Sequence, residues 1–285
     1  MKILPLLILL IFAAGGCIQQ IALNSLGSVL DTGFDVINRE EDLTLAQASI
    51  ASDLKLLETL IARDPGNAHY LLLASMGYSS YALGFAEDDS VERAKLFYAR
   101  GRDFGFRILD AGDAFRTARG QGPQEFREAL RSLSRDDVPA VFWTAVGWGN
   151  SVLLNLSDPA ALADLPKIEA MMEFVVRNDS TYFYGGALSF LGAYHGSRPA
   201  MFGGDPRLAK NYFHRALGIS GGKFLMTYIL FAKTCAVQSQ DRQLFESCLT
   251  AVDTASLDRL PEARLSNAIA KKKAMILRSK TDTLF

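Results

Sequence analysis

The sequence predicts an all-α protein, a solenoid of helical hairpins with two related lobes around a central groove or pore. Apolar residues recur three and four positions apart along most of the chain, and the alternation typical of strands is nearly absent. Proline and glycine fall between these periodic stretches rather than inside them. Stretches in the two halves of the chain also share one spacing of small and aromatic residues, which indicates an internal repeat.

The helix expected over residues 42–63 shows the periodicity most clearly. Its apolar stripe consists of Leu43, Ala46, Ile50, Leu54, Leu57 and Ile61. Asp64-Pro65-Gly66 ends it. The same pattern predicts a loop over 112–122 and further helices over 68–85, 91–109, 123–133, 138–156, 160–177, 181–195, 206–217, 223–238, 242–254 and 262–280. Within the last helix, Lys271, Lys272 and Lys273 are expected on a solvated face.

The internal repeat relates Met76-Gly77 to Leu191-Gly192. From these positions an alanine, an aromatic and a small residue follow at equal spacing in both copies. The aligned pairs are Ala94 with Ala209, Tyr98 with Phe213, and Gly101 with Ala216. The pattern resembles the tetratricopeptide (TPR) signature, in which small residues let the two helices of a hairpin approach closely. We therefore expect residues 42–285 to form one TPR-like α-helical domain.

The first sixteen residues have the three regions of a secretory signal peptide. Lys2 precedes an apolar run from Ile3 to Ala14, which is too short for a membrane span, and small residues stand directly before Cys17. A cysteine at this place resembles the bacterial lipobox, so we expect cleavage before Cys17 and its acylation, with an uncleaved signal as the alternative. Residues 17–41 then form the lipidated N-terminal segment and first helix, held to a lipid membrane by several acyl chains.

Charge and cysteine content narrow the function classes further. The 30 basic and 31 acidic residues nearly cancel, which argues against a nucleic-acid partner. Two cysteines remain beyond the signal, Cys235 and Cys248, in an oxidising compartment. Either a disulfide or two separately buried thiols is consistent with their positions on two successive helices.

The segment Gly203-Gly204-Asp205-Pro206 is expected to be a structural loop that opens a helix. The two glycines permit positive φ, the aspartate can cap the next helix, and the proline suits its first position. A phosphate site is the alternative, but no strand precedes the loop and the aspartate occupies the place of an anion.

No motif predicts catalysis, a metal site or a cofactor. The chain lacks an HExxH zinc motif, a CxxC pair, an EF-hand loop and a phosphate-binding GK[ST]. His69, His195 and His214 are expected at the surface or in helix packing. We therefore expect a binding protein and no enzyme.

Aromatic residues gather on the first helices of the predicted hairpins, which line the concave face of a solenoid. An aromatic-lined groove could hold a peptide or an apolar small ligand, although ordinary core packing explains such rings equally well. The candidate ligand or partner groove consists of Tyr78, Tyr81, Trp143, Tyr184, Tyr194 and Arg198. Arg198 could instead hold the glycine loop by donating to its carbonyl groups.

One run of residues carries a family resemblance. It comprises Leu191, Gly192, Tyr194, Arg198, Pro199, Gly203, Gly204, Asp205, Pro206, Ala209, Phe213, Ala216 and Leu217. Together with EEDLTLAQASIASDLKLLETLIARDPGN and LSNAIAKKKAMIL, this run is similar to the TatT family, TPR-like periplasmic lipoproteins associated with TRAP transporters (tripartite ATP-independent periplasmic transporters). The similarity extends over essentially the whole mature chain.

The resemblance implies helical hairpins around a central pore, a periplasmic solute-binding protein (P component) as partner, and self-association into a homo-oligomer. It carries no catalytic residues. We expect a lipid-anchored periplasmic scaffold of TRAP-type uptake that holds the P component and an apolar or organic-acid ligand. The alternative is a general envelope scaffold for protein assembly without ligand transport. Ile18 rather than aspartate follows Cys17, which by resemblance to bacterial sorting rules favours the outer membrane.

Overall fold

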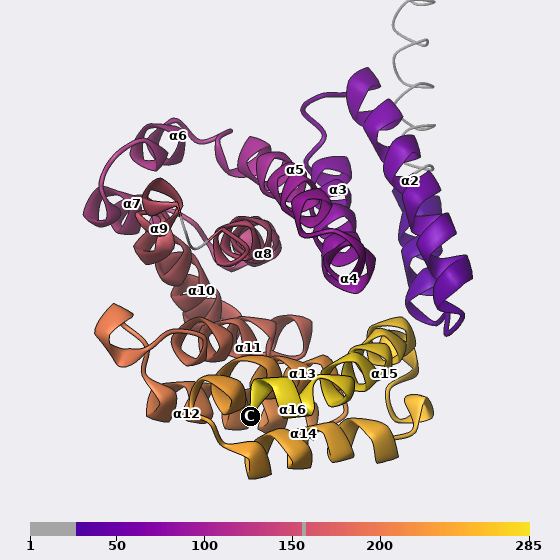
Figure 1. Ribbon diagram of the computed structural model, residues 1–285. Coiled ribbons are helices and arrows are strands. Elements are labelled where there is room, and N and C mark those ends of the chain that lie inside the picture. Colours follow the sequence, from indigo (N-terminus) through magenta and orange to yellow (C-terminus); the bar gives the residue numbers. More distant parts are fainter. Residues whose placement is uncertain (1–26, 156–157) are drawn as a thin grey trace, which may run out of the picture.

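The computed structural model describes residues 27–155 and 158–285, and every regular element among them is helical (Figure 1). The expected signal peptide and Cys17 lie outside these residues. A helix spans residues 27–38 at the start of the described chain. The elements that follow are α2 (Leu43–Arg63), α3 (Ala68–Tyr81), η1 (Ala82–Ala86), α4 (Glu87–Asp89), α5 (Val91–Leu109), α6 (Asp113–Arg119), α7 (Pro123–Leu130), η2 (Arg135–Asp137), α8 (Val138–Leu153), α9 (Pro159–Leu162), α10 (Leu165–Asp179), α11 (Tyr182–Gly196), η3 (Ala200–Phe202), α12 (Pro206–Ser220), α13 (Met226–Phe231), η4 (Ala232–Ala236), α14 (Arg242–Thr254), η5 (Leu257–Arg259), η6 (Pro261–Ala263), α15 (Arg264–Ser279) and α16 (Thr281–Leu284).

Helix starts coincide with the polar residues that cap them. The side chains of Asp42, Ser90 and Asp205 accept backbone N–H groups at the first turns of α2, α5 and α12. These N–H groups have no partner within their own helix, so each cap stabilises one particular starting residue. The helices predicted from the apolar pattern at 91–109 and 242–254 are present with those bounds as α5 and α14.

Four predicted stretches differ in the structure. The loop expected over 112–122 contains α6, because a short amphipathic turn buries Phe115 against Phe126 of α7. The helix expected over 160–177 is divided into α9 and α10. The helices expected over 68–85 and 223–238 each contain a wider π-helical segment, η1 and η4, in which each backbone N–H bonds to the carbonyl five residues earlier. α-Helical residues follow both segments.

A close contact between α5 and α8 depends on glycine. A Cβ added at Gly147 of α8 would lie 2.7 Å from the backbone nitrogen of Arg102 and 2.8 Å from the carbonyl oxygen of Tyr98. Because both neighbours are backbone atoms of α5, they cannot move away as a side chain could. The absence of a Cβ at Gly147 therefore permits the short distance between the two helices. On its other side α5 packs against α3.

The repeat residues lie at helix contacts in both copies. A Cβ added at Gly192 of α11 would lie 2.9 Å from the Phe213 ring of α12, and one at Gly101 of α5 would lie 2.5 Å from the Ser79 hydroxyl of α3. Ala209 and Ala216 are completely buried at the same face of α12. The small residues of the repeat thus permit close helix packing, as the sequence pattern predicted.

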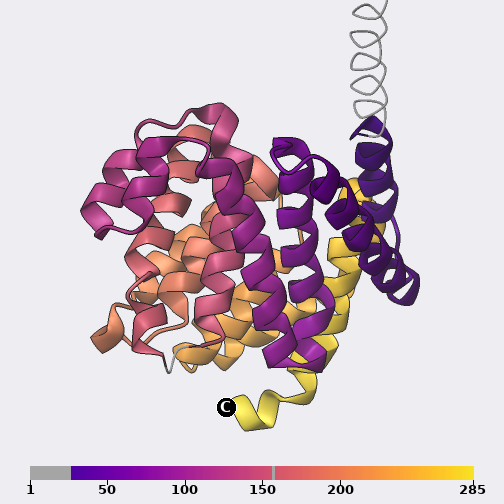
Figure 2. The same cartoon turned by 90° about the horizontal axis from the view of Figure 1, so that it is seen from above.

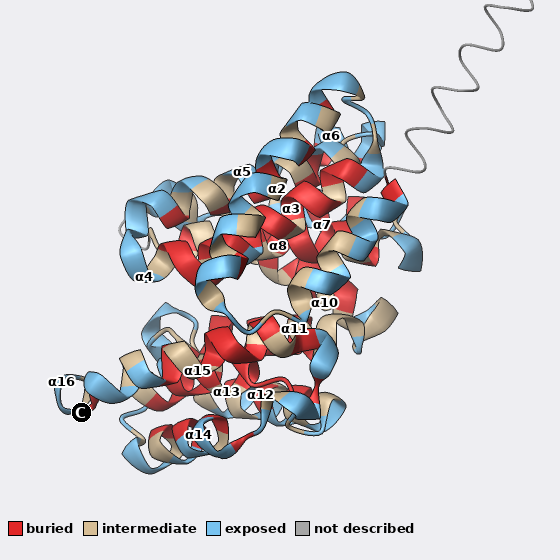
Figure 3. Ribbon diagram, turned by 90° about the vertical axis from the view of Figure 1, so that its right-hand side faces the viewer, coloured by how far each residue is buried: buried red, intermediate tan, exposed pale blue. Residues whose placement is uncertain are grey.

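The chain doubles back on itself after α10. Helices α11 to α16 run beneath α3, α5 and α8, and α15 reaches α2 at the other end of the described chain (Figures 1 and 2). The helices thus form two groups, one with α3, α5 and α8 and the other with α11 to α16 (Figure 1). In both groups buried residues lie on the inward faces, while the outward faces are exposed (Figure 3). The first and last long helices therefore meet and close the arrangement.

A buried ion network joins the two groups of helices at this closure. Lys273 of α15, which is 7% exposed, lies 2.9 Å from a carboxylate oxygen of Asp88 and 3.8 Å from one of Glu87. Glu87 also accepts a hydrogen bond from Tyr98 and pairs with Lys233 of η4. The expectation of a solvated face at Lys271–Lys273 is therefore wrong for Lys273, whose partners come from α4, far away in the sequence.

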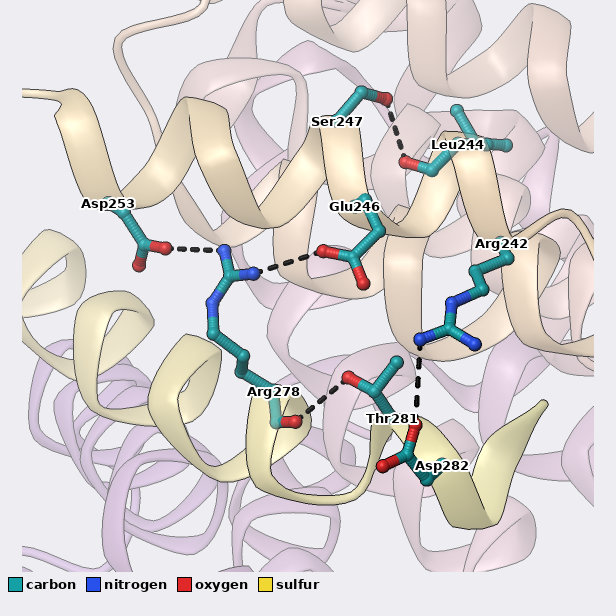
Figure 4. A network of polar contacts seen from close by, with 8 residues as sticks. All are labelled: Arg242, Leu244, Glu246, Ser247, Asp253, Arg278, Thr281 and Asp282. Atoms are coloured by element: carbon teal, nitrogen blue, oxygen red, sulfur yellow. Dashed lines mark hydrogen bonds and ion pairs between the residues drawn. The ribbon is translucent and has the colours of Figure 1, made fainter.

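Polar contacts also fasten the C-terminal helices to α14 (Figure 4). Arg278 of α15 donates to Glu246 and Asp253, which lie on one face of α14. Arg242 reaches Asp282 of α16 at 3.5 Å. The side chains of these pairs are between 39% and 95% exposed, so they contribute little to stability and chiefly orient α15 and α16 on α14.

We expect Gly147→Ala to destabilise the protein by about 1–3 kcal/mol, because its methyl group has to displace the backbone of α5. Gly218→Ala is the matched control, since nothing lies within 4 Å of a Cβ there. That change in α12 should be neutral or stabilise by up to about 1 kcal/mol. Chemical denaturation measures both, and equal effects would show that α5 and α8 do not meet at Gly147.

We expect Lys273→Ala to cost about 3 kcal/mol of unfolding free energy, because it leaves Asp88 and Glu87 with an incomplete set of partners in a buried place. Lys280→Ala, at an exposed residue near the end of the same helix, should stay within about 0.5 kcal/mol of the parent. Comparable losses in the two variants would contradict a special role for Lys273.

Candidate functional site

An apolar cavity lies between the two groups of helices. It encloses about 1450 Å³ of empty space, including the solvent at its mouth. Its walls come from the helix at 27–38 and from α2, α3, η1, α8, α11, α13 and α15. The lining residues are Phe34, Ile37, Asn38, Ile50, Asp53, Leu54, Leu57, Met76, Gly77, Ser79, Ser80, Leu83, Gly84, Phe85, Phe142, Trp143, Val146, Asn150, Leu153, Phe183, Gly186, Ser189, Phe190, Ala193, Phe224, Met226, Leu230, Leu265, Ser266 and Ile269.

One wall of the cavity is a cluster of four aromatic rings. Phe183 lies at the centre, with its ring centroid 4.8 Å from that of Trp143 and 5.7 Å from those of Phe142 and Phe224. The indole N–H of Trp143 donates to the Tyr182 hydroxyl at 3.1 Å, so its polar atom is satisfied. The cluster therefore presents an apolar surface whose one ring donor has a partner within the protein.

An unusual backbone turn supports this wall. Phe183, Tyr184 and Gly185 have φ values of 47°, 59° and 77°, at the very start of α11. This left-handed conformation costs about 1–3 kcal/mol for a residue other than glycine. It persists because Phe183 contacts the aromatic cluster and the Tyr184 ring stacks on Phe224 at 4.8 Å. The turn thus holds Phe183 at the cavity wall.

Few polar groups face the cavity. Ser189 and Thr227 share a hydrogen bond of 3.1 Å and are buried. Ser79 also lines the cavity, but its hydroxyl points toward Gly101 of α5 and has no hydrogen-bond partner among the described residues. Asp53 of α2 is the single ionisable side chain among the described lining residues. Asp53, Ser189 and the remaining polar lining residues could orient a ligand in an otherwise apolar space; the remaining ones are Asn38, Ser80, Asn150 and Ser266.

Asp53 lies where the cavity opens. A shallow outer groove between the helix at 27–38 and α2 is also lined by Ile37 and Asp53, so the two hollows meet at these residues. Burial raises the pKa of the Asp53 carboxyl, and no cation among the described residues offsets this effect. The carboxylate has no ion pair or hydrogen bond within the part of the chain that the structure describes.

The structure places the predicted groove residues in different surroundings. Trp143 lines the cavity, and Tyr184 stacks behind its wall on Phe224. Tyr78 and Tyr81 are buried between α3 and α5, where Tyr78 donates to Glu58 and the Tyr81 hydroxyl is 3.4 Å from Arg93. Their burial away from the cavity matches the alternative explanation of ordinary core packing.

Tyr194 and Arg198 belong to another cluster, at the end of α11. Tyr194 donates to Glu169, which also lies 3.2 Å from His195. The hydrogen bond from His195 holds the pKa of Glu169 below its usual value. The Arg198 guanidinium lies 3.9 Å above the Tyr194 ring and donates to the carbonyls of Tyr194 and Gly203. Arg198 thus holds the glycine loop and does not face the cavity.

The loop from Gly203 to Pro206 opens α12. Gly203 has a φ of 80°, and Asp205 accepts hydrogen bonds from the N–H groups of Arg207 and Leu208 at 2.9 and 3.0 Å. The bonds from Leu208 and Arg207 also lower the pKa of Asp205. Pro206 occupies the first turn of the helix. The loop geometry is that of a helix cap.

Residues Gly218–Gly222 read GISGG, a match to the G-x-S-x-G motif of serine hydrolases that the sequence reasoning overlooked. The motif needs a strand before the serine and a helix after it, whereas here α12 ends at Ser220. The Ser220 hydroxyl donates to the carbonyls of Ala216 and Leu217. This serine therefore has a helix-terminal role.

Metal and thiol chemistry have little support. No group of three or more metal-ligating side chains occurs within residues 27–155 and 158–285. Cys235 and Cys248 are both free and buried, the second of the two arrangements that the sequence allowed. Burial raises the pKa of the Cys248 thiol to about 12, so it is not a reactive thiolate near neutral pH.

Asp53→Asn should stabilise the protein near neutral pH. The folded carboxyl has a pKa above the unfolded value of 3.8, so stability is greatest below that value and is lost as pH rises through the folded pKa. The variant should melt at a higher temperature than the parent at neutral pH and at the same temperature near the unfolded pKa. Melting curves across this range measure the difference, and a lower melting temperature of the variant at neutral pH would contradict it.

Comparison with known proteins assigns the chain to a family. The family model described as TRAP transporter T-component (TAtT) matches residues 39–285, which include α2 to α16 and most of the cavity wall. No curated protein matches the chain. No helix among the described residues is both long and apolar enough to cross a bilayer. Because the match extends over most of the sequence, the chain belongs to the TRAP transporter T-component family.

Proposed function

We propose that this protein is a lipid-anchored periplasmic scaffold of a TRAP-type solute uptake system. It holds the solute-binding P component near the membrane and takes an apolar ligand into the cavity between its two groups of helices. The membership of residues 39–285 in the T-component family carries the proposal, because that family is defined by its association with TRAP transporters. The helical pairs built on small residues support the TPR-like, two-lobed form of this scaffold.

The cavity supports the ligand-binding half of the proposal. Ligand pockets are typically lined mostly by apolar side chains and carry a few polar groups that fix the ligand's orientation. The space here has this apolar character, and the aromatic cluster and the strained turn at Phe183 keep its wall in place. Left-handed backbone at non-glycine residues is found mainly where a site needs it.

The anchoring half rests on the sequence around Cys17. An acylated Cys17 on the outer membrane would place residue 27, where the described chain starts, close to the lipid surface. The helix at 27–38 would then link the anchor directly to the cavity, since Phe34 and Ile37 line it. Self-association into a homo-oligomer is also part of the proposal, on the resemblance to the family.

An exposed apolar pair offers a contact for the P component. Met201 and Phe202 are 83% and 66% exposed and lie on η3. The loop after them is fixed by the hydrogen bond from Arg198 to the Gly203 carbonyl, and Asp205 caps α12. Large apolar side chains on a fixed loop are typical of the anchoring residues in protein interfaces.

Affinity purification tests the proposed partnership. The mature chain, immobilised and incubated with the periplasmic fraction of its own cell, should retain a solute-binding protein that mass spectrometry identifies. Retention of other envelope proteins without a solute-binding protein would instead favour a general envelope scaffold and overturn the proposal. Detection of acyl chains on Cys17 in the cell-derived protein tests the anchor separately.

Phe202→Ser should weaken binding of the retained P component by about tenfold, since truncation of a central aromatic anchor costs about 1–2 kcal/mol. Met275→Ser is the matched control, because Met275 is 65% exposed on α15. Titration of the purified P component by calorimetry measures both affinities. An unchanged affinity of the Phe202 variant would show that the partner binds elsewhere.

A further inference from the structure

The cavity combines apolar walls with a single charged group, and that group is negative. Its described lining contains no lysine, arginine or histidine. An anionic ligand would therefore find no cation to pair with inside. A ligand carboxylate would also have to lose its water in an apolar space, which is costly for an unpaired charge.

Asp53 is directed into this space by the geometry of α2. Leu54 follows it in the sequence, Ile50 and Leu57 lie three and four residues away, and all three line the same cavity. A carboxylate on the apolar stripe of a helix normally has a partner, because a desolvated charge without one is unfavourable. Asp53 has none within the described chain, and burial raises its pKa.

Asp53 lies where it could contact the polar head of a ligand whose apolar part is inside the cavity. Asp53 and Ile37 line both the cavity and the shallow outer groove, so the carboxylate lies at the mouth. The aromatic cluster of Trp143, Phe183 and Phe224 belongs to a wall formed by other helices. A ligand with one polar end could bury its chain against these rings while its head remains at the opening.

We propose that the cavity binds an amphiphile with an apolar chain and a cationic head, a protonated amine or quaternary ammonium, and that Asp53 is the residue that selects this head. The inference rests on the proposed ligand-binding function and narrows its ligand class. It excludes the organic acid that the sequence left open, because a ligand carboxylate at the mouth would meet the Asp53 carboxylate with no cation between them.

A competition assay with three ligands of equal chain length tests this proposal. The protein is the mature chain with Cys17→Ser, so that no acyl chain competes for the cavity. A neutral fluorescent probe, N-phenyl-1-naphthylamine, reports occupancy near neutral pH. Dodecyltrimethylammonium, dodecylamine and dodecanoate then displace it, each below the concentration at which it forms micelles.

We expect both cationic ligands to bind at least about tenfold more tightly than dodecanoate, since a hydrogen-bonded or paired charge contributes on this scale. Asp53→Asn should reduce the preference to less than about threefold while the neutral probe still binds. Asp103→Asn, which removes an exposed carboxylate from α5, should leave the preference unchanged and exclude a bulk charge effect. Melting curves of each variant show that it is folded.

The outcomes separate the inference from the function on which it rests. If the probe binds but dodecanoate competes as well as the cations, the cavity binds ligands and the selection by Asp53 is overturned. If Asp53→Asn keeps the preference for the cationic ligands, another group recognises the ligand head and the inference is equally overturned. If neither the probe nor any amphiphile binds, the proposed ligand-binding function fails as well.

Discussion

The buried contact between Lys273 and the Asp88–Glu87 pair is the interaction on which the arrangement of the helices depends. It joins α15 to α4, and Lys273 and Asp88 are 185 positions apart in the sequence. Leu265, Ser266 and Ile269 of α15 line the cavity, so the cavity has its full wall only when α15 is docked. A buried ion pair is not a strong source of net stability, but it tolerates few alternative geometries. Its role here is to define where α15 lies relative to α3 and α5.

Around the cavity, several local features each oppose folding. Phe183 and Tyr184 adopt left-handed backbone, and Asp53 is a partly desolvated carboxylate. Elsewhere the same chain packs closely, with glycines at the contacts of α5 with α8 and of α11 with α12. A strained turn and a partly desolvated carboxylate at the wall of one open space are consistent with a space that is retained for binding.

Local signals in the sequence were enough to predict most of the helices, but the cavity depends on contacts between distant residues, which no local pattern contains. Helix boundaries follow capping residues such as Asp42 and Ser90 because a cap acts on the N–H groups two or three residues away. The left-handed turn at Phe183 was missed because neither Phe nor Tyr favours it, and contacts with Trp143 and Phe224 impose it. Of the predicted groove residues only Trp143 faces the cavity, because helical spacing alone does not show which aromatic face is buried in the core.

The helix at 27–38 connects the two proposed roles physically. A helix of this length is marginal on its own, so its position depends on what it packs against. Leu30 packs beside Ile61 and Tyr70, and His69 of α3 lies 3.1 Å from Asp31. The same helix supplies Phe34 and Ile37 to the cavity wall. If the preceding segment is held at the membrane through Cys17, any displacement of this helix relative to α3 moves part of the cavity wall. Anchoring and ligand occupancy are then linked through one short helix that only tertiary contacts hold in place.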